Sequence, residues 1–222
     1  MTRKELSPTE RTRLGRHRER GKDERADLYA VLDAGVVCHL GMVRDGSPLV
    51  LPTCYGRDGD TLYVHGSVAA RNLVAAGTGL EVCVTITHLD GLVLARSVFD
   101  HSMNYRSAVI LGTARQVTDP DEVLTGLRVI TEQVVPGRWE DGGARLPTRK
   151  ELAATTVLAV ALDEASVKVR DAPPGEDEEN DVEHWAGVLP VRTVIGEPVP
   201  APDLAPGIPV PAHVQKRASA PL

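Results

Sequence analysis

The chain has 222 residues and a formal net charge of −6; hydrophobic residues make up 42% of it and aromatic residues only 3%. This length suits one sizeable domain with extensions, and the composition predicts a core of Val, Leu, Ile and Ala. The acidic balance argues against a nucleic-acid binder that works through general basicity. Because the sequence shows neither an apolar run of transmembrane length nor a secretory signal, we expect a cytoplasmic protein without a membrane partner.

The cysteines indicate the same compartment. Cys38, Cys54 and Cys83 lie within or beside apolar runs, and their odd number fits reduced thiols better than a disulfide framework. They lack the paired spacing of a zinc site, so no metal site is predicted. We interpret Cys54 as a packing residue.

The first third of the chain predicts a helix followed by strands. Asp23 is expected to cap a helix that ends at Gly35. Strands are predicted at residues 36–43, 48–55 and 61–65, and both connecting turns contain Asp-Gly, a pair suited to tight hairpins.

The middle of the chain predicts a second hairpin and a long strand. Residues 81–88 and 92–99 are expected to form strands on either side of a turn at Asp90-Gly91. Residues 106–117 predict the long strand. Asp119 and Pro120 then begin a helix with apolar residues at helical spacing.

The last third begins with a capping box, Thr148 and Glu151, for a short helix. Residues 156–162 and 166–170 resemble one long, interrupted strand. An acidic loop and a short structured return at residues 184–194 follow, and the remainder is rich in Pro and Ala.

The order of these elements favours a barrel. The strands are joined mostly by hairpins, and no G-x-G-x-x-G follows a strand, so a Rossmann fold is disfavoured. Six or seven antiparallel strands in one domain predict closure, which removes exposed edges. The predicted organisation is a polar arm at residues 1–22, a barrel domain at 23–195 and an extended tail at 196–222.

Residues 52–72, PTCYGRDGDTLYVHGSVAARN, carry the clearest functional pattern. They predict strand, turn, strand and the start of a short helix. A helix N-terminus offers free N–H groups and suits a phosphate. Ser67 is placed to cap this helix, and Arg71 lies about one turn further on. The pattern predicts a nucleotide cofactor that lies across a β-surface.

Together these motifs resemble the pyridoxamine 5′-phosphate oxidase-like FMN-binding split barrels, in particular the flavoprotein branch that includes the nitroimidazole reductases. The resemblance rests on residues 52–72, on FDHSMNYRSAVILGTARQV at 99–117 with the DPDE helix after it, and on HWAGVLPV at 184–191. It implies a mainly β fold, a six-stranded antiparallel split barrel with short flanking helices. It also implies a homodimer with FMN between the subunits.

The resemblance further implies the residues of the FMN site. Strand 48–55 would line the isoalloxazine, and the end of the next strand would hold the ribityl chain and the phosphate. The long strand would contribute from the partner subunit, and Trp185 is a candidate for stacking over the flavin. The expected cofactor-binding residues are Val50, Leu51, Pro52, Thr53, Val64, His65, Ser67, Arg71, Tyr105, Arg106, Ser107 and Trp185.

Two departures separate the chain from the pyridoxamine oxidases themselves. Ala70 stands where they carry a second basic residue, and their C-terminal Arg-x-His pattern has no counterpart here. We therefore expect an FMN-dependent oxidoreductase that acts on a small organic molecule other than pyridoxamine phosphate. No catalytic residue is assigned, because a bound flavin carries the redox chemistry.

Other functions stay open on the sequence. The chain is also compatible with a non-catalytic flavin- or haem-binding protein for storage or sensing, in which His65, His101 and His184 are available as haem ligands. A deazaflavin-dependent reductase is a further alternative, as is a barrel that serves only as a dimeric scaffold.

Overall fold

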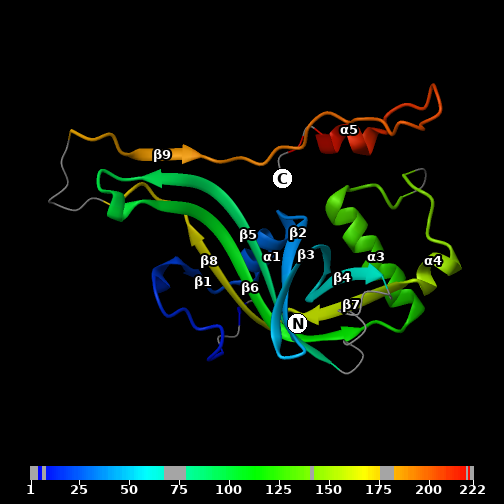
Figure 1. Cartoon of the computed structure of the whole chain (residues 1–222), viewed down its shortest axis with the longest axis horizontal. Coiled ribbons are helices and arrows are strands. Elements are labelled where there is room, and N and C mark those ends of the chain that lie inside the picture. The colour runs from blue at the N-terminus through cyan, green and yellow to red at the C-terminus, as the bar shows by residue number, and fades with distance from the viewer. Residues whose placement is uncertain are drawn as a thin grey trace.

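Nine antiparallel strands form one sheet in the computed structural model, which describes residues 5–6, 9–67, 79–140, 143–175, 183–218 and 220. The strand order is β1-β8-β6-β7-β4-β3-β2-β5-β9, and β6 also pairs with β5. This extra pairing closes the six strands from β2 to β7 into a ring (Figure 1). The ring confirms the predicted six-stranded barrel, and β1, β8 and β9 extend it.

Two tight hairpins form the first half of the ring. They connect β2 (Val37–Arg44), β3 (Ser47–Asp58) and β4 (Thr61–Ser67). In the first turn Asp45 and Gly46 have φ angles of 49° and 76°. Asp and Gly adopt this left-handed conformation at low cost, which confirms the predicted Asp-Gly turn.

The predicted hairpin at Asp90-Gly91 is wrong. β5 (Leu80–Leu94) continues through these residues as one strand and pairs with β6 (Ser102–Gln116) on both sides of an irregularity between Leu89 and Gly91. After the irregularity β5 also pairs with β9 (Gly187–Pro190). Asp90 is therefore the extra residue of a β-bulge, held in the sheet by both neighbouring strands.

β7 (Thr155–Ala161) and β8 (Glu164–Arg170) follow one another along the same edge of β6, which confirms the predicted interrupted strand. β7 also pairs with β4, whereas β8 pairs with the short β1 (Gly21–Lys22). The interruption therefore marks the place where the sheet splits. A 3-10 turn, η1 (Arg18–Arg20), precedes β1.

The first helix, α1 (Arg25–Asp33), packs against β5, β6 and β8. Its N-cap is Glu24, so the predicted cap at Asp23 is wrong; the Asp23 carbonyl instead accepts a hydrogen bond from the backbone of Leu6 at 2.7 Å. The buried Arg25 side chain donates to Asp60 Oδ1 at 2.7 Å, which ties α1 to the turn between β3 and β4.

The other helices lie outside the ring. α3 (Pro120–Val134) packs against β3, β4 and β7, and its predicted cap, Asp119, accepts hydrogen bonds from the backbone of the first turn. α4 (Arg149–Ala153) has the predicted capping box. α5 (Ala212–Ala218), which the sequence did not predict, interrupts the tail and lies near the end of α3 (Figure 1). Among the described residues, no helix has the length and apolar character needed to span a membrane.

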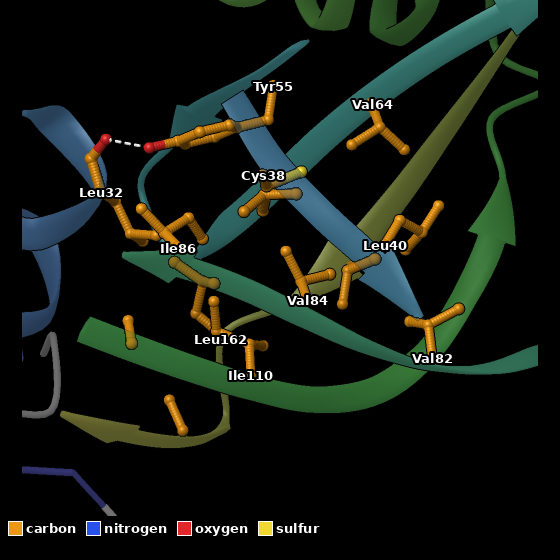
Figure 2. Close-up of a cluster of buried hydrophobic side chains, with 14 of the residues drawn as sticks. Leu32, Cys38, Leu40, Tyr55, Val64, Val82, Val84, Ile86, Ile110 and Leu162 are labelled. Carbon is orange, nitrogen blue, oxygen red and sulfur yellow. Dashed lines mark hydrogen bonds between the residues drawn. The ribbon is translucent and has the colours of Figure 1, made fainter. Parts of the chain in front are cut away.

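Aliphatic side chains from the strands fill the ring. Figure 2 shows Cys38, Leu40, Val84 and Ile110 converging there, while the Tyr55 hydroxyl donates to the Leu32 carbonyl of α1. Burial raises the pKa of the Cys38 thiol to about 12, so this cysteine stays protonated and unreactive at neutral pH.

We predict that Gly56→Ala destabilises the protein. A Cβ at this position of β3 would lie 2.4 Å from the Val129 carbonyl of α3, so the helix backbone must move. Overpacking of this kind costs about 1–3 kcal/mol of unfolding free energy, measurable as a lower urea midpoint. The control is Gly196→Ala, where a Cβ meets open space. Equal midpoints for the two variants would contradict the close packing of α3 on β3.

Candidate functional site

The predicted flavin-lining residues of β3 point to two sides of the sheet. Leu51 and Thr53 pair with β2 residues whose side chains are buried inside the ring. Val50 and Pro52 alternate with them and lie on the outer face, where Val50 is 60% exposed. Side chains from Val50 and Pro52 are therefore available to a ligand outside the ring, whereas Leu51 and Thr53 offer it only their backbone.

One backbone edge of β3 is open beside these residues. Residues 47–54 pair with β2, but β4 pairs with β3 only from Tyr55 onward. Within the described part of the chain, no strand pairs with residues 47–54 on the β4 side. Backbone N–H and C=O groups along this edge need partners, and a planar polar ligand is one way to supply them.

The two predicted site residues of β4, Val64 and His65, also point to opposite sides of the sheet. Val64 is 1% exposed and packs in the ring, so its side chain does not reach the outer face. His65 lies on the opposite side of the strand and is open to solvent, yet desolvation by the surrounding protein lowers its pKa. A neutral imidazole is therefore expected at pH 7.

The predicted phosphate clamp, formed by Ser67 and Arg71, comes shortly after His65 in the chain. Ser67 is the last residue of β4, but its side chain, the predicted helix after it and Arg71 lie outside the described residues. The clamp stays a prediction from the sequence.

The residues predicted on β6 lie away from β3. Tyr105 and Ser107 are on the outer face, but β2 and β5 lie between β3 and β6. Three strand spacings correspond to roughly 14 Å, so these side chains do not adjoin Val50 in the same chain. The Ser107 hydroxyl donates to the Lys168 carbonyl of β8 at 3.3 Å. A contribution of this strand to the partner's site, which the resemblance implies, stays a prediction.

Arg106 points to the other side of β6. Its guanidinium donates to both Asp90 carboxylate oxygens, from Nε at 2.9 Å and from Nη2 at 2.8 Å. These hydrogen bonds raise the pKa of Arg106 above its ordinary value. The β-bulge therefore fixes Arg106 on the face opposite Tyr105 and Ser107.

A cavity of about 900 Å³ lies beside the β-bulge. Residues 87–90 of β5 and Arg106 form one wall. The opposite wall is the extended segment 191–195 after β9, which we call the strap, together with Ala218 and Ala220. The backbone N–H of Val191 donates to the Asp90 carbonyl at 3.0 Å and anchors the strap at the bulge. We call this cavity the strap pocket.

The sequence analysis missed the strap pocket. Asp90 was predicted in a turn, residues 184–194 in a short structured return and residues 196–222 in an extended tail, so the two walls were not placed together. The available signal was an ionisable residue, Asp90, followed by Gly91 inside an otherwise apolar strand pattern.

Trp185, predicted to contact the flavin, lies next to β9 on the projecting end of β5 and β6. It is 66% exposed, and its ring lies against Gly187. Phe99, in the 3-10 turn η3 (Val98–Asp100), is 88% exposed. His101 follows this turn, with its Nδ1 3.0 Å from the Ser97 carbonyl. Large apolar side chains are therefore exposed along this projection.

Comparisons with known proteins extend over most of the chain. The family model described as pyridoxamine 5′-phosphate oxidase matches residues 24–169. The structure of the flavocytochrome Anf3 from Azotobacter vinelandii is 37% identical, with a TM-score of 0.88, and the match covers 96% of this chain and 98% of that chain. The comparison with curated proteins found no match.

Two further solved structures are also similar to this chain. The FAD and haem binding protein from Mycobacterium smegmatis is 39% identical, with a TM-score of 0.84 and coverage of 89% of this chain and 97% of that chain. A Bacteroides thetaiotaomicron protein named for 5-nitroimidazole antibiotic resistance is 21% identical and has a TM-score of 0.55; its match covers 67% of this chain and 86% of that chain and supports the fold. The chain belongs to the pyridoxamine 5′-phosphate oxidase-like split-barrel family.

Proposed function

We propose that this protein is an oxidoreductase that binds a flavin nucleotide at the open edge of β3 and also binds a haem. The observation that carries the proposal is the likeness to a flavocytochrome and to an FAD and haem binding protein. Both matches include almost the full length of the two chains compared, whereas the family model ends at residue 169.

The open edge of β3 suits a flavin. Unpaired backbone groups at residues 47–54 match the polar edge of an isoalloxazine ring, and Val50 and Pro52 give it apolar contact. Ser67 and Arg71 are the proposed phosphate ligands. A bound flavin supplies hydride and electron transfer, while the protein orients the ring and limits its access to water.

The flavin is proposed to lie at a homodimer interface. Val37, Val43 and Val50 are 45%, 64% and 60% exposed on the outer face of β2 and β3. α3 covers β3, β4 and β7 but leaves these side chains open. A second copy placed on this face buries them and brings Tyr105 and Ser107 towards the flavin of its partner.

A second candidate function is electron storage or sensing without a dedicated substrate. It is favoured by the names of the two similar proteins, which specify bound groups and no substrate. Anaerobic photoreduction followed by mixing with organic electron acceptors separates the two functions. Rapid reoxidation by one class of acceptor supports the oxidoreductase, and equally slow reoxidation by all of them supports storage.

We predict that the freshly purified protein shows both flavin absorbance and a Soret band. Acid extraction followed by chromatography then identifies the flavin as FMN, which the sequence resemblance implies, or FAD, which the mycobacterial relative is named for. A colourless protein that takes up neither FMN nor FAD when they are added would refute the flavin site.

Arg71→Ala is expected to weaken flavin binding about tenfold or more, because a hydrogen bond to a charged phosphate contributes about 1.5–3 kcal/mol. Quenching of flavin fluorescence during titration of the apoprotein measures the Kd. Arg149→Ala, which removes an exposed arginine of α4, is the matched control. An unchanged Kd for Arg71→Ala removes this residue from the site.

Val43→Asp is expected to shift the protein from dimer to monomer, because it places a charge in the proposed interface. Light scattering during size-exclusion chromatography measures the mass. Val199→Asp is the control, since Val199 lies in the tail and is 90% exposed. If both variants keep the mass of the wild type, the second copy does not sit on this face.

A further inference from the structure

A cavity of about 350 Å³ lies between the end of α3 and α5, the helix that interrupts the tail (Figure 1). We call it the α5 cavity. Its described lining comes from the loop after α3 and from α5 with its end: Pro136, Gly137, His213, Lys216, Arg217 and Ala220. Three of these residues are basic and none is acidic, although the whole chain has a net charge of −6.

The two permanent positive charges of the α5 cavity have no counter-charge in the described part of the chain. Arg217 Nε donates to the carbonyl of Val134, the last residue of α3, at 3.0 Å. This bond caps α3, but its acceptor is neutral and it leaves the two terminal nitrogens of the guanidinium. Neither Arg217 nor Lys216 forms an ion pair with a described carboxylate. Two adjacent cations without a carboxylate favour an anion between them.

Glu132 of α3 does not supply that anion, because the backbone of the neighbouring loop occupies its carboxylate. Oε2 accepts from the N–H of Gly137 and Oε1 from the N–H of Trp139, both at 2.6 Å. Gly137 has a φ of 83°, which glycine adopts at low cost. The carboxylate of Glu132 therefore shapes the wall opposite α5 and is not available to the basic side chains.

The imidazole of His213 has an unmet hydrogen bond. Its Nε2 is buried and has no hydrogen-bond partner among the described residues. Most buried polar side-chain atoms of native proteins have such a partner. Because Nε2 is closed to solvent, we expect the ring to turn when a hydrogen-bond acceptor enters the cavity. The ring is a second, independent feature that favours an anionic ligand here.

The size of the α5 cavity favours an organic phosphate over a bare ion. A water molecule occupies about 30 Å³ in the liquid, so about 350 Å³ corresponds to roughly twelve water-sized groups. Phosphate alone is much smaller than this. The planar fork of an arginine matches phosphate oxygens, and a lysine binds them as a point charge. Pro136 and Ala220 offer apolar contact to the remainder of the ligand.

We propose that the α5 cavity binds a small phosphorylated molecule, with Lys216 and Arg217 as the ligands of its phosphate group. This site is separate from the proposed flavin site. Ala220 lines both the α5 cavity and the strap pocket, and Ala218 lines the strap pocket alone. A ligand that holds α5 against α3 therefore also fixes one wall of the strap pocket.

The test is calorimetric titration of the full-length protein, as purified, with glycerol phosphate and, separately, with glycerol. The wild type is expected to bind only the phosphate. Lys216→Gln removes a charge from an exposed side chain and is expected to raise the Kd for glycerol phosphate about tenfold. Lys150→Gln, which changes an exposed lysine of α4, is the matched control and keeps the Kd of the wild type.

Trypsin cleavage gives a second readout that requires no variant. Trypsin cuts after Lys216 and Arg217 in α5 and after Arg192 in the strap. At ten times the Kd, glycerol phosphate is expected to slow the release of residues 218–222 about tenfold, because only the unliganded fraction is cut. Cleavage after Arg192, which lies outside the α5 cavity, is the internal reference.

Three results would overturn the proposal. A wild type that binds no glycerol phosphate at ~10 mM has no such site. An equal loss of binding in Lys216→Gln and Lys150→Gln shows a general charge effect. A higher Kd for flavin in Lys216→Gln shows that the cavity serves the flavin nucleotide and not a separate ligand. The absorbance spectrum tests the proposed function independently, so a protein without flavin that still binds glycerol phosphate refutes that function alone.

Discussion

The fold depends on strand β6, which pairs with different strands along its two edges. One edge of β6 pairs with β5 along almost its whole length, and the other edge pairs with β8 and then with β7. Because β7 also reaches β4, the same strand closes the ring and extends beyond it. The aliphatic core, the open edge of β3 and the projecting end of β5 and β6 all follow from this arrangement.

Local sequence signals predicted the elements whose chemistry is local. Asp45-Gly46 predicted the first hairpin, and Asp119-Pro120 predicted the start of α3. Thr148 and Glu151 predicted the cap of α4. Each of these features depends only on residues that are close in the sequence. Asp90-Gly91 carries the same turn signal but forms a bulge. The difference comes from β6 and β9, which hold β5 in the sheet on both sides of the bulge.

The candidate site was predictable as a region but not as a set of side chains. Residues 50–53 are consecutive, and only the register with β2 shows that Leu51 and Thr53 face inward while Val50 and Pro52 face outward. A local signal marked Asp90 as unusual but did not indicate the strap pocket, because its walls come from residues near 88, near 106 and beyond 190. Nothing in the sequence pattern places those segments together.

The register of β5 and β6 also decides which side chains face the proposed dimer interface. Neighbouring residues of a strand point to opposite faces, so Tyr105 and Ser107 lie on the outer face of β6 while Arg106, between them, points to the other side. In the proposed dimer, Ser107 would approach the flavin of the partner, whereas Arg106, one residue earlier, is bound to Asp90 of its own chain. The β-bulge at Asp90 enforces this division, because the Asp90 carboxylate holds Arg106 and the Asp90 carbonyl anchors the strap through the backbone N–H of Val191.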